Sequence, residues 1–390
     1  MGIFSKKKKE ELALVFDVGS SAVSGALFYM GKDGTPKIIM NVSESIILEE
    51  KVNVEKFLRN TMETLKTVSS KICLAGKGAP RRVFVVLSSP WFVSQTRVIK
   101  YTKKDSFLFT SKLANELIEK EVKIFEEEYG VKYAHTENKV KPIELKNMKT
   151  RLNGYDSANP FNQSVKEVEM NIFVSLAQEK VLNGINKAIG RHFGHENIKF
   201  SSFIIASFTV ARDVFINQEN FLLVNIGGEV TDISMIKKDV LRESISFPMG
   251  CNFLIRNIAD KLDISLEESK TYLSLYKDGH MEETILKKVE PAITLAKNEW
   301  LKNFQEFLSK LTNDISIPST VFVTVDPHLS LFFSDTIKNE QFNQYILTES
   351  KFRVVFLGAQ ALHGIVTLKE EETRDPAVII DSIYINRFLR

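Results

Sequence analysis

The chain has 390 residues, of which 44% are hydrophobic and 26% are charged, and its formal net charge is +3. This length predicts at least two domains with cores of their own, and the weak charge gives no reason to expect nucleic acid as a partner. Two cysteines are too few for a disulfide framework, and no apolar run reaches the roughly 18 residues of a membrane span. We therefore expect a cytoplasmic protein.

The first apolar segment, residues 12–28, is interrupted by the tight turn Gly19-Ser20-Ser21, and this pattern predicts a β-hairpin. A third strand is predicted at 37–40 and a helix at 53–74, where apolar residues recur at helical spacing. Residues 81–87 are apolar on both faces, which predicts a buried strand.

The middle of the chain predicts a helix at 111–129, a polar and loop-rich stretch at 130–164, a strand at 167–176 and a helix at 178–193. A second hairpin with the turn Gly227-Gly228-Glu229 is expected at 221–236.

Helical stripes follow at 254–276 and 281–311, then a buried strand at 320–325 and a strand with a helix at 352–368. The last segment, 376–390, is rich in β-branched residues, which favours an added strand or a docked peptide over a helix.

The two hairpins share the same pattern of apolar strands around a small-residue turn, although they lie about 200 residues apart. The tip of such a hairpin can present backbone N–H groups to an anion, so two of them suggest a phosphate-binding cleft. The alternative for each hairpin alone is an ordinary turn with Asp and Gly turn chemistry.

These residues resemble the actin-like ATPase superfamily, and in particular its FtsA/PilM branch. The resemblance covers nearly the whole chain, and the segments that carry it are Asp17-x-Gly19-Ser20-Ser21, Gly227-Gly228…Thr231-Asp232, Phe247–Ala259 and, in the middle, Val83–Leu87, Thr110, Gly154, Asn159-Pro160 and Val168-Glu169. It implies an α/β protein with a two-domain actin-like (ribonuclease H-like) ATPase fold and an inserted SHS2-type α+β subdomain.

The resemblance also implies a division of the chain. We expect a basic tail at 1–11, the first part of domain I at 12–80, the SHS2-type insertion at 81–176, the second part of domain I at 177–218, domain II at 219–370 and a C-terminal tail at 371–390.

The cofactor implied by the resemblance is ATP with magnesium. Asp17 stands where the first magnesium carboxylate belongs, and Mg²⁺ needs few protein ligands because it keeps much of its water shell. The residues expected to hold the nucleotide are Asp17, Gly19, Ser20, Ser21, Asn225, Gly227, Gly228, Thr231 and Asp232.

Several positions depart from the superfamily pattern. Asn225 replaces a second acidic residue, and Glu229 replaces a glycine. At a separation of about 4 Å and an effective dielectric of about 20, the charge of Glu229 would repel a phosphate by about 4 kcal/mol. On the adenosine side, Ser269-Lys270 takes the place of a Glu-containing motif, although a one-residue shift would restore Glu268. Val325-Asp326-Pro327-His328 stands where a Gly-Gly pair is usual. We expect a weak or vestigial ATP site and no catalytic residues.

The function implied is that of a scaffold or adaptor at the inner face of the cytoplasmic membrane, with FtsA-like cell division as the first expectation. A PilM-like platform for type IV pili is the alternative, and an active ATPase or small-molecule kinase is the second alternative. Expected partners are cell-division or pilus inner-membrane proteins. Self-association is a further alternative. Either chain end could also contact a membrane surface, but for the N-terminal tail we favour a solvated state.

Overall fold

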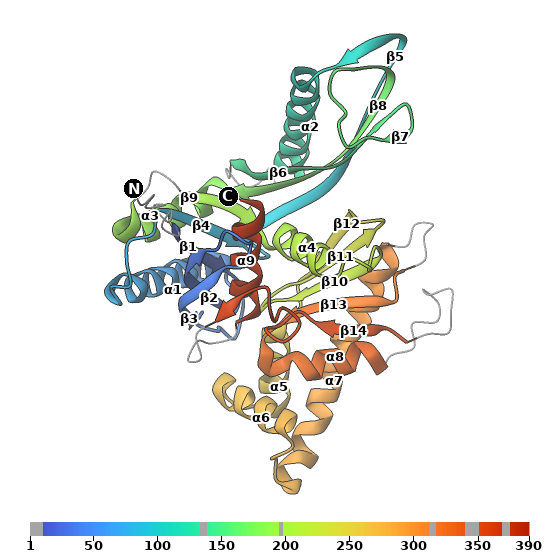
Figure 1. Cartoon of the computed structure of the whole chain (residues 1–390). Coiled ribbons are helices and arrows are strands. Elements are labelled where there is room, and N and C mark those ends of the chain that lie inside the picture. The colour runs from blue at the N-terminus through green and yellow to red at the C-terminus, as the bar shows by residue number, and fades with distance from the viewer. Residues whose placement is uncertain are drawn as a thin grey trace.

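Three β-sheets organise the computed structural model of the chain (Figure 1). The structure describes residues 11–132, 139–194, 198–311, 317–339, 351–368 and 375–389. Residues 1–10 of the expected basic tail therefore lie outside the described residues, as do 369–374 and Arg390 of the C-terminal segment, whereas Glu11 begins the first strand. No helix within these ranges combines the length and the apolar character that crossing a membrane requires.

The first sheet has six strands in the order β15-β3-β2-β1-β4-β9. Its strands are β1 (Glu11–Val18), β2 (Ala22–Met30), β3 (Lys37–Ser45), β4 (Arg82–Leu87), β9 (Ile198–Ser202) and β15 (Thr367–Leu368). The helices that pack on it are α1 (Val54–Leu74), α3 (Glu179–Phe193), α4 (Phe203–Val214) and α9 (Pro376–Phe388). Because helices cover the sheet, residues 13–18 of β1 are buried without alternation.

The second sheet has five strands in the order β12-β11-β10-β13-β14. Its strands are β10 (Phe221–Ile226), β11 (Thr231–Lys237), β12 (Val240–Phe247), β13 (Thr320–Val325) and β14 (Arg353–Phe356). The helices on this side are α5 (Cys251–Leu262), α6 (Leu266–Asp278), α7 (Glu283–Lys310), the short 3₁₀ helix η1 (Pro327–Leu329) and α8 (Ser330–Asn339).

The two sheets repeat one arrangement. In the first, β1 pairs antiparallel with β2 and parallel with β4, and in the second, β10 pairs antiparallel with β11 and parallel with β13. Both predicted hairpins are therefore confirmed. Asp17 lies opposite Ser24 in one hairpin, and Asn225 lies opposite Asp232 in the other.

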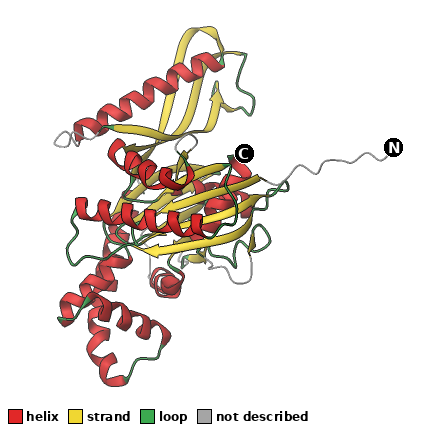
Figure 2. Cartoon of the chain, turned by 90° about the vertical axis from the view of Figure 1, so that its left-hand side faces the viewer, coloured by secondary structure: helices red, strands yellow, loops and turns green. Residues whose placement is uncertain are grey.

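The third sheet projects from the other two, with a long helix on one face (Figures 1 and 2). Its order is β5-β8-β6-β7, from β5 (Phe92–Phe109), β6 (Val140–Leu152), β7 (Tyr155–Asp156) and β8 (Gln163–Gln178), and the helix is α2 (Ser111–Lys132). The chain leaves the first sheet after β4 and rejoins it at β9, so we call this unit the inserted sheet.

Three sequence predictions are wrong. The stretch at 130–164 contains the 13-residue strand β6, whose charged residues pair across the open face of the inserted sheet. No helix forms among the described residues between β14 and β15.

The third wrong prediction concerns the C-terminal segment, which forms helix α9 rather than a strand. Asp375 caps its first turn by accepting a hydrogen bond from the Ala377 amide (3.0 Å), and Pro376 occupies the position where proline is tolerated. The β-branched side chains are buried almost throughout, so packing outweighs intrinsic propensity.

Candidate functional site

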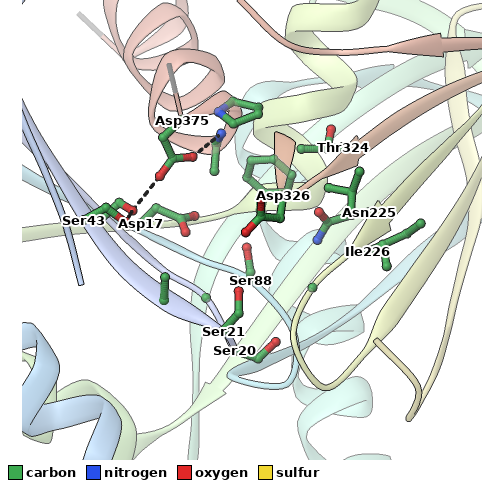
Figure 3. Close-up of a pocket in the computed structure, with 18 of the residues that line it drawn as sticks. Asp17, Ser20, Ser21, Ser43, Ser88, Asn225, Ile226, Thr324, Asp326 and Asp375 are labelled. Atoms are coloured by element: carbon green, nitrogen blue, oxygen red, sulfur yellow. Dashed lines mark hydrogen bonds between the residues drawn. The ribbon is translucent and has the colours of Figure 1, made fainter. Parts of the chain in front are cut away.

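A cavity of about 410 Å³ lies where the carboxyl ends of β1, β4, β10 and β13 meet (Figure 3). Ligands bind at this edge of open α/β sheets because the loops after parallel strands converge there. Asp17 is the last but one residue of β1 on one side, Asn225 is the last but one residue of β10 on the other, and Asp326 follows β13 between them. The N-terminal end of α9 closes the cavity with Asp375, Pro376 and Ala377.

Asp17 faces this cavity from a buried position, and its Oδ1 atom has no hydrogen-bond partner. Burial raises the pKa of Asp17 well above its ordinary value, and repulsion from Asp375 adds to the effect, whereas a hydrogen bond with Ser88 opposes it. Asp375 is held by the Ser24 hydroxyl, which donates to its Oδ2 atom at 2.6 Å.

The cavity is acidic. Asp17, Asp326 and Asp375 line it, and among the described residues no lysine or arginine does so. The orphaned Asp17 oxygen fits a magnesium ion. In the described part of the chain, however, no three acidic, histidine or cysteine side chains lie close enough to share one ion. Such an ion would therefore keep most of its water shell, as Mg²⁺ commonly does.

The two hairpin turns, which we call the phosphate-1 turn (Gly19–Ser21) and the phosphate-2 turn (Gly227–Val230), touch each other. The Glu229 amide donates to the Ser20 hydroxyl at 3.0 Å. A Cβ atom on Gly228 would lie 2.7 Å from the backbone of Ser20, closer than real Cβ contacts. The predicted residues are thus brought together, but a polyphosphate does not fit between the turns unless they move apart.

Two further amides of the turns are bonded within their own hairpins, since Gly19 donates to the Ala22 carbonyl (3.2 Å) and Gly227 to the Val230 carbonyl (2.9 Å). Fewer donors are therefore available to an anion than the hairpin pattern suggests.

Glu229 turns away from the cavity. Arg256 on α5 donates two hydrogen bonds to its carboxylate, both at 2.7 Å, and Asn252 donates a third at 2.7 Å. Because the charge is paired and does not line the cavity, the repulsion expected from the sequence does not apply. The same guanidinium donates to the Glu49 carbonyl at 2.7 Å, which links the second sheet to the loop after β3.

Thr231 and Asp232 bond to protein groups. The Thr231 hydroxyl donates to the Met249 carbonyl (2.6 Å) and accepts from the Trp300 indole (3.2 Å). Asp232 Oδ1 accepts from Ser89 (2.7 Å) and Ser246 (2.6 Å), while burial raises its pKa. Neither residue lines the cavity.

The segments predicted for the adenosine side meet at a second cavity of about 320 Å³ beside α5 and α6. Four residues line both cavities, namely Ser21, Ile226, Asp326 and His328. Lys270 lines the second cavity, but Ser269 is buried and donates to the Ile255 carbonyl at 2.7 Å. Glu268 accepts from Tyr272 (3.0 Å) and is absent from the lining.

Sequence reasoning missed two acidic residues, Asp375, which caps α9, and Asp381 within that helix. Asp375 lines the cavity, and Asp381 is fully buried with neither carboxylate oxygen bonded. The pair Asp375-Pro376 is a helix-start signal that would have identified the first. Nothing in the sequence places the second near Asp17.

A chain of the PilM-PilN type IV pilus biogenesis complex is 15% identical, with a TM-score of 0.62 over 97% of this chain and 98% of that one. This chain has the actin-like ATPase fold. At this identity the match shows the fold alone.

Two further solved structures match less well. EutJ, an ethanolamine utilization protein of Carboxydothermus hydrogenoformans, is 10% identical over 97% of this chain and 89% of that one, with a TM-score of 0.43. A PPX-GPPA enzyme of Aquifex aeolicus is 14% identical over 85% of this chain and 72% of that one, with a TM-score of 0.36. No family model and no curated protein matches the chain.

Removing the Glu229 side chain is not expected to improve nucleotide binding. Glu229→Gly should leave the affinity for Mg-ATP within about twofold of the wild-type value, or weaken it, because the carboxylate points to Arg256 rather than into the cavity. Calorimetry measures this directly, with Asp17→Asn as a control expected to weaken any magnesium-dependent binding. Binding at least tenfold tighter in the glycine variant would contradict the geometry.

Proposed function

We propose that this chain is a PilM-like platform protein of type IV pilus assembly, acting at the cytoplasmic face of the inner membrane. The observation that carries the proposal is the likeness to a chain of the PilM-PilN complex, which extends over 97% of this chain and so includes the inserted sheet. The likeness favours the pilus alternative over the FtsA-like cell-division role that the sequence put first.

The proposal places the chain in the FtsA/PilM branch and treats the inserted sheet as an SHS2-type subdomain. It keeps the expected order of the domains, with domain I at 12–80 and 177–218, the insertion at 81–176 and domain II at 219–370, except for the first boundary of the insertion. The exit of the chain after β4 and its return at β9 support an insertion within domain I. Because β4 (Arg82–Leu87) pairs with β1 and β9 of the first sheet, we assign it to domain I and begin the insertion after Leu87.

In this proposal the cleft is a conformational latch rather than an enzyme. Asp17, Gly19, Ser20 and Ser21 would face the magnesium ion and phosphates from one side, and Gly227 and Gly228 from the other, once the turns have parted. Two observations support low or absent turnover: Asn225 provides no second carboxylate, and the turns are closed on each other.

The inserted sheet is the proposed partner-binding surface, because its face opposite α2 carries exposed apolar side chains. Val98 is 50% exposed and pairs with Asn171 of β8, whereas the neighbouring Met170 and Ile172 pack in the core under α2. Side chains directly opposite each other in an antiparallel pair share a face, so Val98 lies on the uncovered side.

Binding to a peptide from a PilN-type protein of the same organism tests the proposal. We expect micromolar or tighter binding to this peptide, at least tenfold weaker binding for Val98→Asp, and unchanged binding for Leu295→Asp, a control that is 47% exposed on α7. Binding of a cell-division partner instead of the pilus peptide would favour the FtsA-like function.

A further inference from the structure

We propose that the turn connecting β4 to the inserted sheet, residues 88–91, transmits the separation of the two phosphate turns to that sheet. We call these residues the junction turn. This inference adds to the proposed function. It rests on that function in one respect only, namely that a partner binds the inserted sheet.

The junction turn is hydrogen-bonded to both sides of the cleft. The indole of Trp91 donates to the Gly19 carbonyl in the phosphate-1 turn at 2.8 Å. The Ser89 hydroxyl donates to Asp232, one residue into β11 after the phosphate-2 turn, at 2.7 Å. Ser88, Ser89 and Trp91 are all buried, so water does not readily replace these bonds.

The junction turn is also a rigid unit. The Ser88 amide donates to the Val18 carbonyl and the Trp91 amide to the Ser88 carbonyl, each at 3.1 Å. The Trp91 ring stacks on Phe57 of α1 with 5.0 Å between ring centroids. A displacement at either bonded end therefore moves the whole turn rather than bending it.

The inserted sheet begins directly after this turn. Phe92 and Val93, the first residues of β5, pair with Ala177 and Leu176 at the end of β8, the strand through which the chain leaves the sheet. A shift of Trp91 therefore reaches both strands that connect the inserted sheet to the rest of the protein. β12 of the second sheet also packs against β5, so the second sheet contacts the base of the inserted sheet directly.

A second contact holds the inserted sheet on the first-sheet side. Glu144 of β6 accepts hydrogen bonds from Ser201 (2.7 Å), from the amide and hydroxyl of Ser202 (3.0 and 2.9 Å) and from Tyr384 of α9 (2.7 Å). This carboxylate fixes β6 to the first sheet. When the second sheet displaces the junction turn, the inserted sheet therefore tilts about Glu144 instead of moving as a whole.

Forced separation of the phosphate turns tests the coupling without any ligand. Gly228→Ala places a Cβ atom 2.7 Å from the Ser20 backbone and must push the turns apart. We expect amide hydrogen exchange of residues 92–96 and 173–177, at the base of the inserted sheet, to become at least tenfold faster. The matched control is Gly130→Ala on α2, where an added Cβ meets no atom within 4 Å, and exchange at the base should not change.

Trp91→Phe tests the same link without added bulk. It keeps a six-membered ring that can stack on Phe57 and removes the N–H group that bonds to Gly19, together with the pyrrole part of the indole. We expect faster exchange both in the phosphate-1 turn and at the base of the inserted sheet. This variant decides the question if the alanine variant does not fold.

The proposal is overturned if Gly228→Ala accelerates exchange in the phosphate turns alone, or if Trp91→Phe changes only one of the two regions. Failure of the pilus peptide to bind would refute the proposed function but would leave these exchange patterns unaffected, so the two failures are distinguishable.

Discussion

Replacing Arg256 by alanine should lower the free energy of unfolding by about 3 kcal/mol, because it leaves the Glu229 carboxylate without its charged partner in a largely buried position. The side chains of Arg256 and Glu229 are only 19% and 12% exposed, and the pair is bidentate with both distances at 2.7 Å. The change also removes the bond from Arg256 to the Glu49 carbonyl. Urea unfolding followed by circular dichroism measures the loss.

A double-mutant cycle separates the cost of the orphaned charge from the loss of packing. Glu229→Ala combined with Arg256→Ala should cost less than Arg256→Ala alone, because the carboxylate is no longer stranded. Lys287→Ala is the comparison, since the Lys287–Glu283 pair is 74% and 79% exposed and should contribute less than about 0.5 kcal/mol. Equal losses in Arg256→Ala and Lys287→Ala would show that the pair contributes nothing.

Asp381→Asn should flatten the pH dependence of stability and make the protein more stable than the wild type at pH 8. Asp381 is fully buried, and neither oxygen has a hydrogen-bond partner. Burial raises its pKa well above the ordinary value, and the charges of Asp17 and Asp375 raise it further. The folded protein therefore retains a proton that the unfolded chain releases above pH of about 4.

The sign follows from this difference in bound protons. Above a pH of about 4, the unfolding free energy of the wild type falls as pH rises towards the raised pKa, by up to about 1.4 kcal/mol per pH unit for one retained proton. Asparagine has no carboxyl proton to release, so in the variant position 381 no longer contributes to the pH dependence of the unfolding free energy. Urea unfolding between pH 5 and 8 measures the effect, and Asp260→Asn, at an exposed position on α5, should keep the wild-type slope. A wild-type protein that gains stability from pH 5 to 8 would contradict the argument.

Much of the fold is predictable from the sequence because its signals are local. The hairpins at 12–28 and 221–236 show apolar strands around small-residue turns, and the structure confirms both. The helix expected at 53–74 is α1, which begins after Asn53. The Asn53 side chain caps this helix by accepting a hydrogen bond from the Lys56 amide. The strand expected at 81–87 is β4, buried between β1 and β9.

The site was less predictable because its decisive contacts join residues far apart in the chain. The sequence shows Glu229 in a glycine position but gives no sign that Arg256 and Asn252 on α5 turn its charge away. Likewise, the acidic character of the cavity depends on Asp375, which meets Ser24 across a separation of 351 residues. Local patterns indicate which turns could bind phosphate, but not whether those turns lie open or closed.

The position of α9 also constrains the order in which the protein can fold during synthesis. Its side chains complete the core against β1, β2 and α4, although β1 and β2 emerge from the ribosome first. At 5 to 20 residues per second, the 351 residues between Ser24 and Asp375 take about 20 to 70 s to translate. For that interval the apolar surface that α9 covers has no final partner, so we expect the nascent first sheet to depend on chaperones until the last helix arrives.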